Sequence, residues 1–330
     1  MNRWPRVLTD LDVPQIDWWG ERMVVYRRTA SSHVLQELSE LWKFAKTALS
    51  YDVVITANVR HALALGIAKR LLRRRRPRHL MVEMRLDDPR PDVLWRAKVR
   101  LQRWAMATVD VMCVSARREI ELYAKRLRRP LAGFTFVPWH TNILEPSAIP
   151  APAGHIFAAG RTGRDWKTFA AAVKNIAVPV VAICGRDGAA AMGSAPRARV
   201  LVDVPYEQYR GELAAARVVV VPLEPHVYSS GQVVVLEAMA LGKPVVATRV
   251  LGTEDYIRHG VDGLLVAPEK PEELRAALDR ILSDPELERT LAENAVKRIQ
   301  ERHTLQKYVS TIAELAVNAH QQGALDSARD

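Results

Sequence analysis

The feature that most constrains the fold is an alternation of short apolar runs with longer, helix-periodic segments. Residues 52–56 and 109–114 are short runs rich in β-branched side chains, and the apolar residues of 33–50 recur every three to four positions. The second half repeats the alternation, for example in the apolar runs 155–159 and 218–221. Such repeated βα units predict parallel sheets with helices on both faces.

The predicted elements cover most of the chain. The strands are expected at 23–26, 52–56, 79–84, 109–114, 133–137, 155–159, 178–183, 199–202, 218–221, 244–247 and 264–266. The helices are expected at 33–50, 59–75, 92–107, 116–127, 166–175, 206–216, 232–241 and through most of the tail from residue 271. A glycine pair makes residues 184–188 a predicted loop.

A proline-rich break divides the two series of elements. Pro146, Pro150 and Pro152 stand among small residues, as in an interdomain linker. The chain has 330 residues, enough for two domains that each bury a core. The sequence therefore predicts two doubly wound, Rossmann-like domains facing a cleft. The predicted bounds are 1–145 for the first domain, 146–154 for the linker, 155–302 for the second domain, and 303–330 for a C-terminal helix that packs back on the first.

Cysteine usage and hydropathy indicate a cytoplasmic protein. Cys113 and Cys184 each lie in an apolar run, so both are expected to be buried and unpaired, as in a reducing compartment. The first 20 residues lack the apolar core of a signal peptide. No apolar run approaches the roughly 20 residues of a membrane-spanning helix.

Positive charge is concentrated in one part of the chain. Residues 60–129 hold 20 Lys or Arg and 7 Asp or Glu, a local excess of 13, whereas the rest of the chain sums to −2. Such a block suits anionic lipid, phosphorylated substrates or nucleic acid, or it is simply a solvated surface. Without a nucleic-acid-binding module, no nucleic-acid partner is expected. Trp95 and Trp104 on a cationic helix favour contact with an anionic membrane, and a core helix with snorkelling cations is the alternative.

Residues 229–248 carry the most informative motif. Small residues precede a predicted helix, and the unpaired N–H groups of a helix start can bind phosphate or diphosphate. Glu237 lies about two turns further, where a carboxylate can accept hydrogen bonds from ribose hydroxyls. A serine-capped helix with an exposed glutamate is the structural alternative. The candidate binding residues here are Ser229, Ser230, Gly231, Gln232, Val233 and Glu237.

This stretch resembles the donor-site signature of retaining glycosyltransferases of family 4 (glycosyl transferases group 1), written E-x7-E followed by A-M-A-x-G-x-P-V-V-A. Glu237 falls on the second glutamate, and Ser229 stands where the family has the first. Residues 252–256 and 259–266 resemble the family's next block, and the likeness covers roughly 155–320. The resemblance implies the GT-B fold and a UDP- or GDP-sugar donor. The serine leaves the identity of the donor sugar open.

The resemblance also assigns roles to a second segment, 159–167. The family places Gly-Arg at this strand end, which corresponds to Gly160 and Arg161, followed by a second cation. Arg164 is the best match for that cation, and Lys167 is the alternative. Two guanidinium groups suit a diphosphate and would stabilise charge on the leaving nucleotide, so no metal or other cofactor is expected. The predicted catalytic residues are Arg161, Arg164 and Glu237.

Weaker assignments complete the predicted site. By resemblance, Arg186 and Tyr206 face the nucleobase, although a turn and a structural tyrosine explain them equally well. Asp87 and Asp88 either position an acceptor hydroxyl or form a solvated turn before Pro89. The sequence thus predicts transfer of a sugar, with retention, to a glycan or lipid-linked acceptor in polysaccharide or glycoconjugate synthesis. The alternative is a nucleotide-sugar-binding protein without transferase activity.

Overall fold

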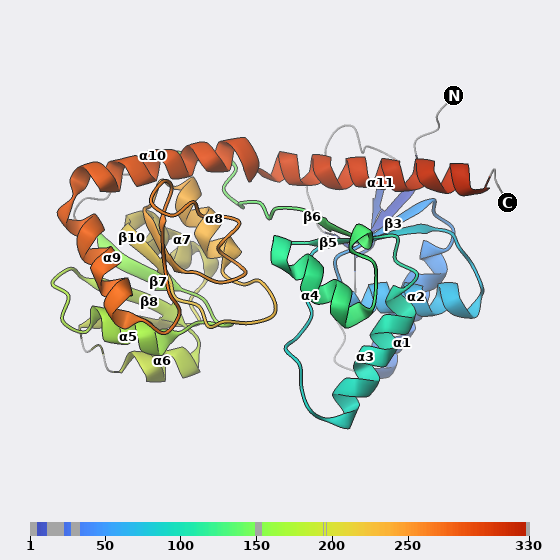
Figure 1. The fold of residues 1–330 in the computed structure, drawn as a ribbon, viewed down its shortest axis with the longest axis horizontal. Helices are drawn as coiled ribbons and strands as arrows, with labels where there is room; N and C mark the ends of the chain where they lie inside the picture. The colour runs from blue at the N-terminus through green and yellow to red at the C-terminus, as the bar shows by residue number, and fades with distance from the viewer. Residues whose placement is uncertain are drawn as a thin grey trace. The chain divides into compact units, whose positions relative to one another are not determined.

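The computed structural model of the chain describes residues 5–11, 23–27, 34–148, 154–193, 195 and 197–327. The chain divides into two compact units, which are described separately. Unit 1 comprises Met1–Pro138 and Tyr308–Asp330, and unit 2 comprises Trp139–Lys307 (Figure 1). Residues 149–153 of the predicted linker lie outside the described residues, as do 12–22 near the N-terminus.

Within the described residues, unit 1 contains a six-stranded parallel sheet in the order β2-β1-β3-β4-β5-β6. Its strands are β1 (Val7–Thr9), β2 (Met23–Val25), β3 (Val53–Thr56), β4 (Arg78–Met81), β5 (Val111–Val114) and β6 (Phe134–Phe136). The direction of strand addition reverses between β1 and β3. Ligands of open parallel sheets bind beside such a switch point, at the carboxyl ends of the strands.

Helices flank this sheet, and polar side chains fix where two of them begin. The helical elements of unit 1 are α1 (Val34–Ala48), α2 (Val59–Leu71), α3 (Val93–Met106), α4 (Arg117–Leu127), the 3-10 turn η2 (Leu131–Gly133) and most of α11 (Leu305–Ser327). Asn58 caps α2 by accepting a hydrogen bond from the backbone N–H of Arg60 at 2.8 Å. Asp92 caps α3 through the N–H of Trp95 at 2.6 Å.

Unit 2 contains a second six-stranded parallel sheet within the described residues, in the order β12-β11-β10-β7-β8-β9. Its strands are β7 (His155–Ala159), β8 (Val180–Cys184), β9 (Ala198–Val202), β10 (Ala216–Val221), β11 (Val245–Thr248) and β12 (Leu264–Val266). Strand order reverses between β7 and β10. The loops that leave these two strands therefore start at the switch point of this unit.

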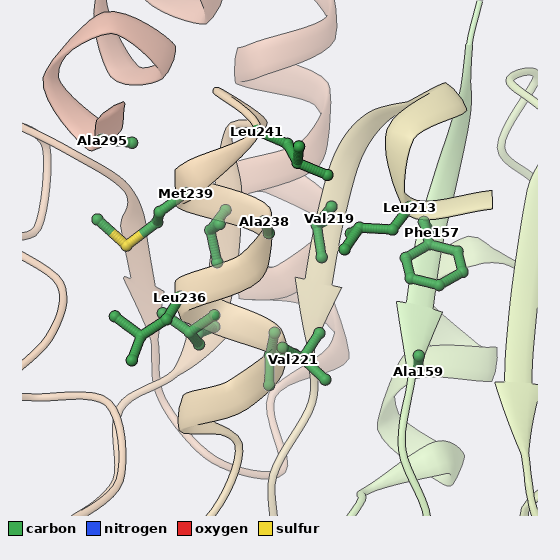
Figure 2. Close-up of a cluster of buried hydrophobic side chains, with 14 of the residues drawn as sticks. Phe157, Ala159, Leu213, Val219, Val221, Leu236, Ala238, Met239, Leu241 and Ala295 are labelled. Carbon is green, nitrogen blue, oxygen red and sulfur yellow. The ribbon is translucent and has the colours of Figure 1, made fainter. Parts of the chain in front are cut away.

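The sheet of unit 2 is covered on both faces. Phe157 packs in the cluster that includes β10 and α8, whereas its neighbour Ile156 packs in the cluster that includes α5 and α9. Figure 2 shows the first cluster, in which Ala238 of α8 faces Val219 of β10, while Leu236 and Met239 lie on the opposite side of the helix. The helices are α5 (Trp166–Val173), α6 (Arg186–Met192), α7 (Tyr206–Ala215), α8 (Gln232–Ala240), α9 (Pro271–Ser283) and α10 (Pro285–Arg302).

The structure confirms the predicted α/β class and differs from the sequence prediction at two elements. Strand β1 was not predicted, so Met23–Val25 is the second strand of the first sheet and not the first. Residues 184–188, predicted as a loop, contain the end of β8 and the first turn of α6, because Gly185 acts as the N-cap of that helix. Both cysteines are buried and free, as predicted.

Candidate functional site

The β7–α5 loop, residues 160–165, is held in shape by its own arginine. Arg164 donates from Nε to the carbonyl of Ala159 at 2.9 Å and from Nη1 to the carbonyl of Thr162 at 2.9 Å. Gly160 has a φ of 134°, and a Cβ there would lie 2.4 Å from Nε of Arg164, so only glycine fits. Burial lowers the pKa of the Arg164 guanidinium to about 10. Two of its donors therefore stabilise the loop, and among the described residues Nη2 has no hydrogen-bond partner.

Arg161 of the same loop is exposed. Its guanidinium pairs with Asp203 at 2.9 Å, with 70% of the Arg161 side chain and 52% of the Asp203 side chain accessible to solvent. Exposed pairs of this kind contribute about 0–1 kcal/mol, so an anionic ligand can draw Arg161 away at little cost. Lys167, the alternative second cation, is exposed on the first turn of α5.

The β10–α8 loop, residues 222–231, lies directly against the β7–α5 loop. The N–H of Asp165 donates to the carbonyl of Pro222 at 3.1 Å, and the N–H of Glu224 donates to the carbonyl of Gly163 at 3.1 Å. A Cβ on Gly163 would lie 3.4 Å from the hydroxyl of Ser230. The two loops of the switch point thus form one surface, and the predicted donor-binding residues Gly160, Arg161, Arg164 and 229–233 belong to its two segments.

The N-terminus of α8 opens onto this surface. Gly231 is the N-cap, with a φ of 88°, and no side chain caps the helix. Gly252 packs closely against the backbone of Ser230, because a Cβ on Gly252 would lie 2.1 Å from the carbonyl oxygen of Ser230. Gln232 is buried, and among the described residues its side-chain nitrogen has no hydrogen-bond partner. First-turn N–H groups at the positive end of a helix are a general anion site, to which Gln232 adds a donor.

Glu237 is fully buried one to two turns into α8, and its carboxylate is held by three donors. Oε1 accepts from the hydroxyl of Tyr206 at 2.9 Å and from the amide of Asn142 at 3.3 Å, and Oε2 accepts from the hydroxyl of Tyr209 at 2.7 Å. The predicted alternative of an exposed glutamate is wrong. Burial is the main reason that the pKa of both tyrosines is raised, and the nearby carboxylate adds to the effect.

The two predicted nucleobase residues differ in their relation to this cluster. Tyr206 joins it through Glu237, and its ring stacks on Tyr209 with centroids 5.8 Å apart. Arg186 is exposed at the first residue of α6, after β8. Tyr209 and Asn142 were not predicted from the sequence. The spacing of Tyr206 and Tyr209 on one helix was the available signal, since residues three apart share a face.

The predicted acceptor residues of unit 1 lie in the turn before α3. Asp87 is exposed and pairs with Lys98 at 2.6 Å, and this hydrogen bond is the main reason that its pKa is lowered. Asp88 is half-buried in the same turn. Both residues therefore have the surroundings of a solvated turn, and Asp87 is already neutralised by a lysine.

A buried acid–histidine pair at the switch point of unit 1 was missed from the sequence. Asp10 follows β1, and its carboxylate accepts from the N–H groups of Ala57 and Asn58, which follow β3. It also contacts Nδ1 of His61 at 2.5 Å. Glu83, after β4, accepts from the hydroxyl of Tyr308 at 3.0 Å, and burial raises its pKa. Asp10 thus fixes the orientation of the His61 imidazole at this edge of the sheet.

These two units define a protein of the GT-B class, with two parallel, helix-flanked sheets. The solved structure of HepE from Anabaena in complex with UDP matches with a TM-score of 0.67 over 89% of this chain and 85% of that chain, at 18% identity. Sucrose-phosphate synthase from Thermosynechococcus elongatus matches with a TM-score of 0.67 over 89% and 82%, at 21% identity. At such identities the matches establish the fold alone.

Sequence comparison then gives the family of the second half. Residues 155–284 match the family model for glycosyl transferases group 1, which confirms the predicted resemblance. A D-inositol 3-phosphate glycosyltransferase from Frankia alni is 40% identical over 110 residues, 33% of this chain and 26% of that protein. An uncharacterised glycosyltransferase from Methanocaldococcus jannaschii is 37% identical over 106 residues, 32% and 25% of the two chains. The matched segments span about a quarter of these relatives.

Proposed function

We propose that the protein transfers a sugar from a UDP- or GDP-sugar to an acceptor, and that unit 2 binds the donor. The observation that carries the proposal is the joining of the β7–α5 and β10–α8 loops at the switch point, beside the uncapped start of α8. The match to the group 1 glycosyltransferase model, 155–284, includes both loops. Structures of the similarly folded HepE contain UDP and UDP-glucose, which supports a nucleotide-sugar donor.

In this proposal each part of the surface meets a different part of the donor. Arg161 and Nη2 of Arg164 bind the diphosphate, together with backbone N–H groups from Gly231 to Val233. The cations stabilise the negative charge that develops on the leaving nucleotide. Because they supply that charge, we propose that transfer requires no metal ion. The product is proposed to keep the anomeric configuration of the donor.

Glu237 is proposed to bind the ribose hydroxyls after a local rearrangement. A carboxylate has about four lone-pair sites, and three already accept hydrogen bonds from the protein. Tyr206 is half exposed, so its hydroxyl is the donor that a ribose displaces most easily. Tyr206 lies on α7, which follows β9. Once its hydroxyl is displaced from Glu237, its ring is proposed to face the nucleobase together with Arg186.

The acceptor is proposed to be a lipid-linked glycan intermediate in polysaccharide or glycoconjugate synthesis, used at the cytoplasmic face of a membrane. The basic block of residues 60–129 belongs to unit 1 and supports an anionic surface or acceptor. No helix among the described residues is long and apolar enough to cross a membrane. We propose that Asp10 and His61, at the switch point of unit 1, orient the acceptor hydroxyl, in preference to the solvated Asp87 and Asp88.

Calorimetric titration with UDP and GDP tests the donor site. Arg161→Ala and Arg164→Ala should each weaken binding by about 1.5–3 kcal/mol, one to two decades in affinity. Lys167→Ala is the matched control, and it separates the two candidates for the second cation. If the wild type binds a nucleotide and both arginine variants bind it equally well, the assignment of these arginines is wrong.

A second candidate function is nucleotide-sugar binding without transfer. Ser229 favours it, because a serine stands where the resembling family carries its first glutamate. Incubation with a panel of UDP- and GDP-sugars and a membrane extract distinguishes the two. Binding without release of the nucleoside diphosphate from any donor supports the second candidate, and release supports the transferase.

A further inference from the structure

Helix α3 of unit 1 exposes large apolar side chains along one face. Its buried residues are Val99, Gln102, Ala105 and Met106. On a different face, Leu94 is 83% exposed, Leu101 is 46% exposed and Trp104 is 41% exposed. Positions 94, 97, 101 and 104 recur at three- and four-residue intervals, so they form one continuous stripe. We call Val93, Leu94, Ala97, Leu101 and Trp104 the α3 stripe.

The stripe adjoins further apolar surface at the end of α2, which packs against α3 (Figure 1). Arg70 of α2 donates from Nε to the carbonyl of Trp104 at 3.1 Å, and its guanidinium lies 5.9 Å from the centre of the Trp104 ring. Leu71 and Leu72 follow directly and are 68% and 52% exposed. Contiguous exposed apolar side chains are uncommon on the surface of a soluble protein, so this cluster indicates a binding surface.

Cations border the stripe. Arg96 and Arg100 are exposed on α3, next to the stripe on its helical projection. Residues 73–76, four consecutive exposed arginines, follow Leu72. On the other side of the stripe Lys98 is neutralised by Asp87 at 2.6 Å. The surface thus combines an apolar centre with a cationic border.

The sequence analysis placed Trp95 together with Trp104 in the predicted membrane contact, and the structure revises the placement of Trp95. Trp95 is half-buried, with the guanidinium of Arg126 5.0 Å from its ring centre. Trp104 alone of the two lies on the stripe. The inserting side chains are therefore mainly leucines, with Trp104.

We propose that α3 lies flat on an anionic bilayer, with the α3 stripe inserted at the headgroup–acyl boundary and the arginines on lipid phosphates. The helix has 14 residues, about 21 Å, which suits an in-plane and not a spanning orientation. Nucleic acid would use the arginines but leave the leucines exposed to water. The proposal extends the proposed membrane location of the acceptor, yet it does not depend on the donor site, since vesicle binding requires no nucleotide.

Sedimentation with two kinds of vesicle tests this docking. One kind is an equimolar mixture of phosphatidylglycerol and phosphatidylcholine, and the other is phosphatidylcholine alone. The wild type should bind the anionic vesicles at low salt, bind the neutral ones poorly, and lose binding as salt rises. Failure to sediment with anionic vesicles at low salt overturns the proposal.

Two double variants separate insertion from charge. Leu94→Ser with Leu101→Ser should lower partitioning about tenfold or more at every salt concentration, because two leucines no longer enter the bilayer. Arg96→Gln with Arg100→Gln should lower it about tenfold or more at low salt and weaken the salt dependence. Leu144→Ser, at a leucine of unit 2 that is 77% exposed, is the control and should bind like the wild type.

Other outcomes would contradict the proposal. Wild-type-like binding by the double leucine variant shows that the stripe does not insert. A wild type that elutes as a dimer, with a monomeric double leucine variant, shows that a second copy covers the stripe. The leucines are exposed, so the variants should fold, and circular dichroism checks that they do.

Discussion

Each unit has a switch point beside its first strand, β1 in unit 1 and β7 in unit 2, and the two switch points differ in chemistry. In unit 2 the loops after β7 and β10 present Arg161, Arg164 and the uncapped start of α8, all of which attract an anion. In unit 1 the corresponding edge, after β1 and β3, contains a buried aspartate bound to a histidine. One sheet edge can attract a phosphate, and under the proposed function the other orients an acceptor hydroxyl. A transferase that joins a nucleotide-sugar to an alcohol needs both kinds.

The largest effect expected from this comparison concerns Asp10. Asp10→Ala leaves Nδ1 of His61 and the N–H groups of Ala57 and Asn58 without their acceptor. Removing one member of a buried pair costs about 3–5 kcal/mol. Urea denaturation should show that the free energy of unfolding of unit 1 falls by this amount. Asp87→Ala, which breaks an exposed pair with Lys98, should cost about 0–1 kcal/mol. Equal stabilities of the two variants would show that the Asp10–His61 pair is not a structural element of unit 1.

The sequence alone identified candidate residues in unit 2 but not the Asp10–His61 pair of unit 1, because of how the residues are spaced. The residues of the β10–α8 segment that are proposed to meet the ligand lie within nine positions, from Ser229 to Glu237, and Gly231 and the helix start after it are local signals. Asp10 and His61 are 51 residues apart, and neither belongs to a local motif. Only the parallel pairing of β1 with β3 brings them together, and β1 was not predicted.

Helical periodicity could have corrected the membrane prediction as well. Trp95 and Trp104 were assigned together because both are tryptophans on a cationic helix. Their spacing of nine residues places them about 180° apart, so they cannot share a face. The exposed stripe of Leu94, Leu101 and Trp104 follows from the same count. The sequence alone does not show which of these two faces of α3 packs against the rest of unit 1.

The second prediction compares the buried histidines of the two units. Burial lowers the pKa of His303 to about 4, and it lowers that of His79 in unit 1 well below the ordinary value. Both are neutral when folded, so their stability contribution is full above about pH 6.5 and is lost as the pH falls. For His303 the loss extends from about pH 6.5 to about pH 4 and amounts to roughly 3 kcal/mol.

Denaturation midpoints at pH 7 and pH 4.5 measure this loss. His303→Gln should reduce the difference between the two pH values for unit 2, because the amide can still donate to the carbonyl of Trp139 but does not titrate. His79→Gln should do the same for unit 1. An unchanged pH dependence in His303→Gln would show that other groups carry the acid sensitivity of unit 2.

The third prediction uses two helical glycines, one in each unit. A Cβ on Gly66 of α2 would lie 2.4 Å from the carbonyl oxygen of Ala105, so the helices α2 and α3 must separate to admit it. Gly66→Ala should therefore destabilise unit 1 by about 1–3 kcal/mol despite the better helix propensity of alanine. Gly211 of α7 has no atom within 4 Å of a Cβ, so Gly211→Ala should stabilise unit 2 by about 0.5–1 kcal/mol. If thermal unfolding shows that both variants change stability in the same direction, the close packing of α2 on α3 is contradicted.

The last prediction concerns Glu237 and tests whether its carboxylate serves a ligand as well as the fold. Glu237→Gln keeps the shape of the side chain, and the tyrosine that faces the new amide nitrogen can rotate its hydroxyl to accept from it, so the unit should stay folded. If Glu237 binds ribose, the variant should bind UDP about tenfold more weakly, roughly 1.4 kcal/mol, and should bind the 2′,3′-dideoxy analogue as the wild type does. Tyr206→Phe is the companion variant, because it removes the hydroxyl that competes with the ribose for Oε1 and should bind UDP more tightly than the wild type. Equal losses for both nucleotides in Glu237→Gln would assign the carboxylate to holding α7 against α8. Anion binding at the switch point of unit 2 would then rest on Arg161, Arg164 and the helix start alone.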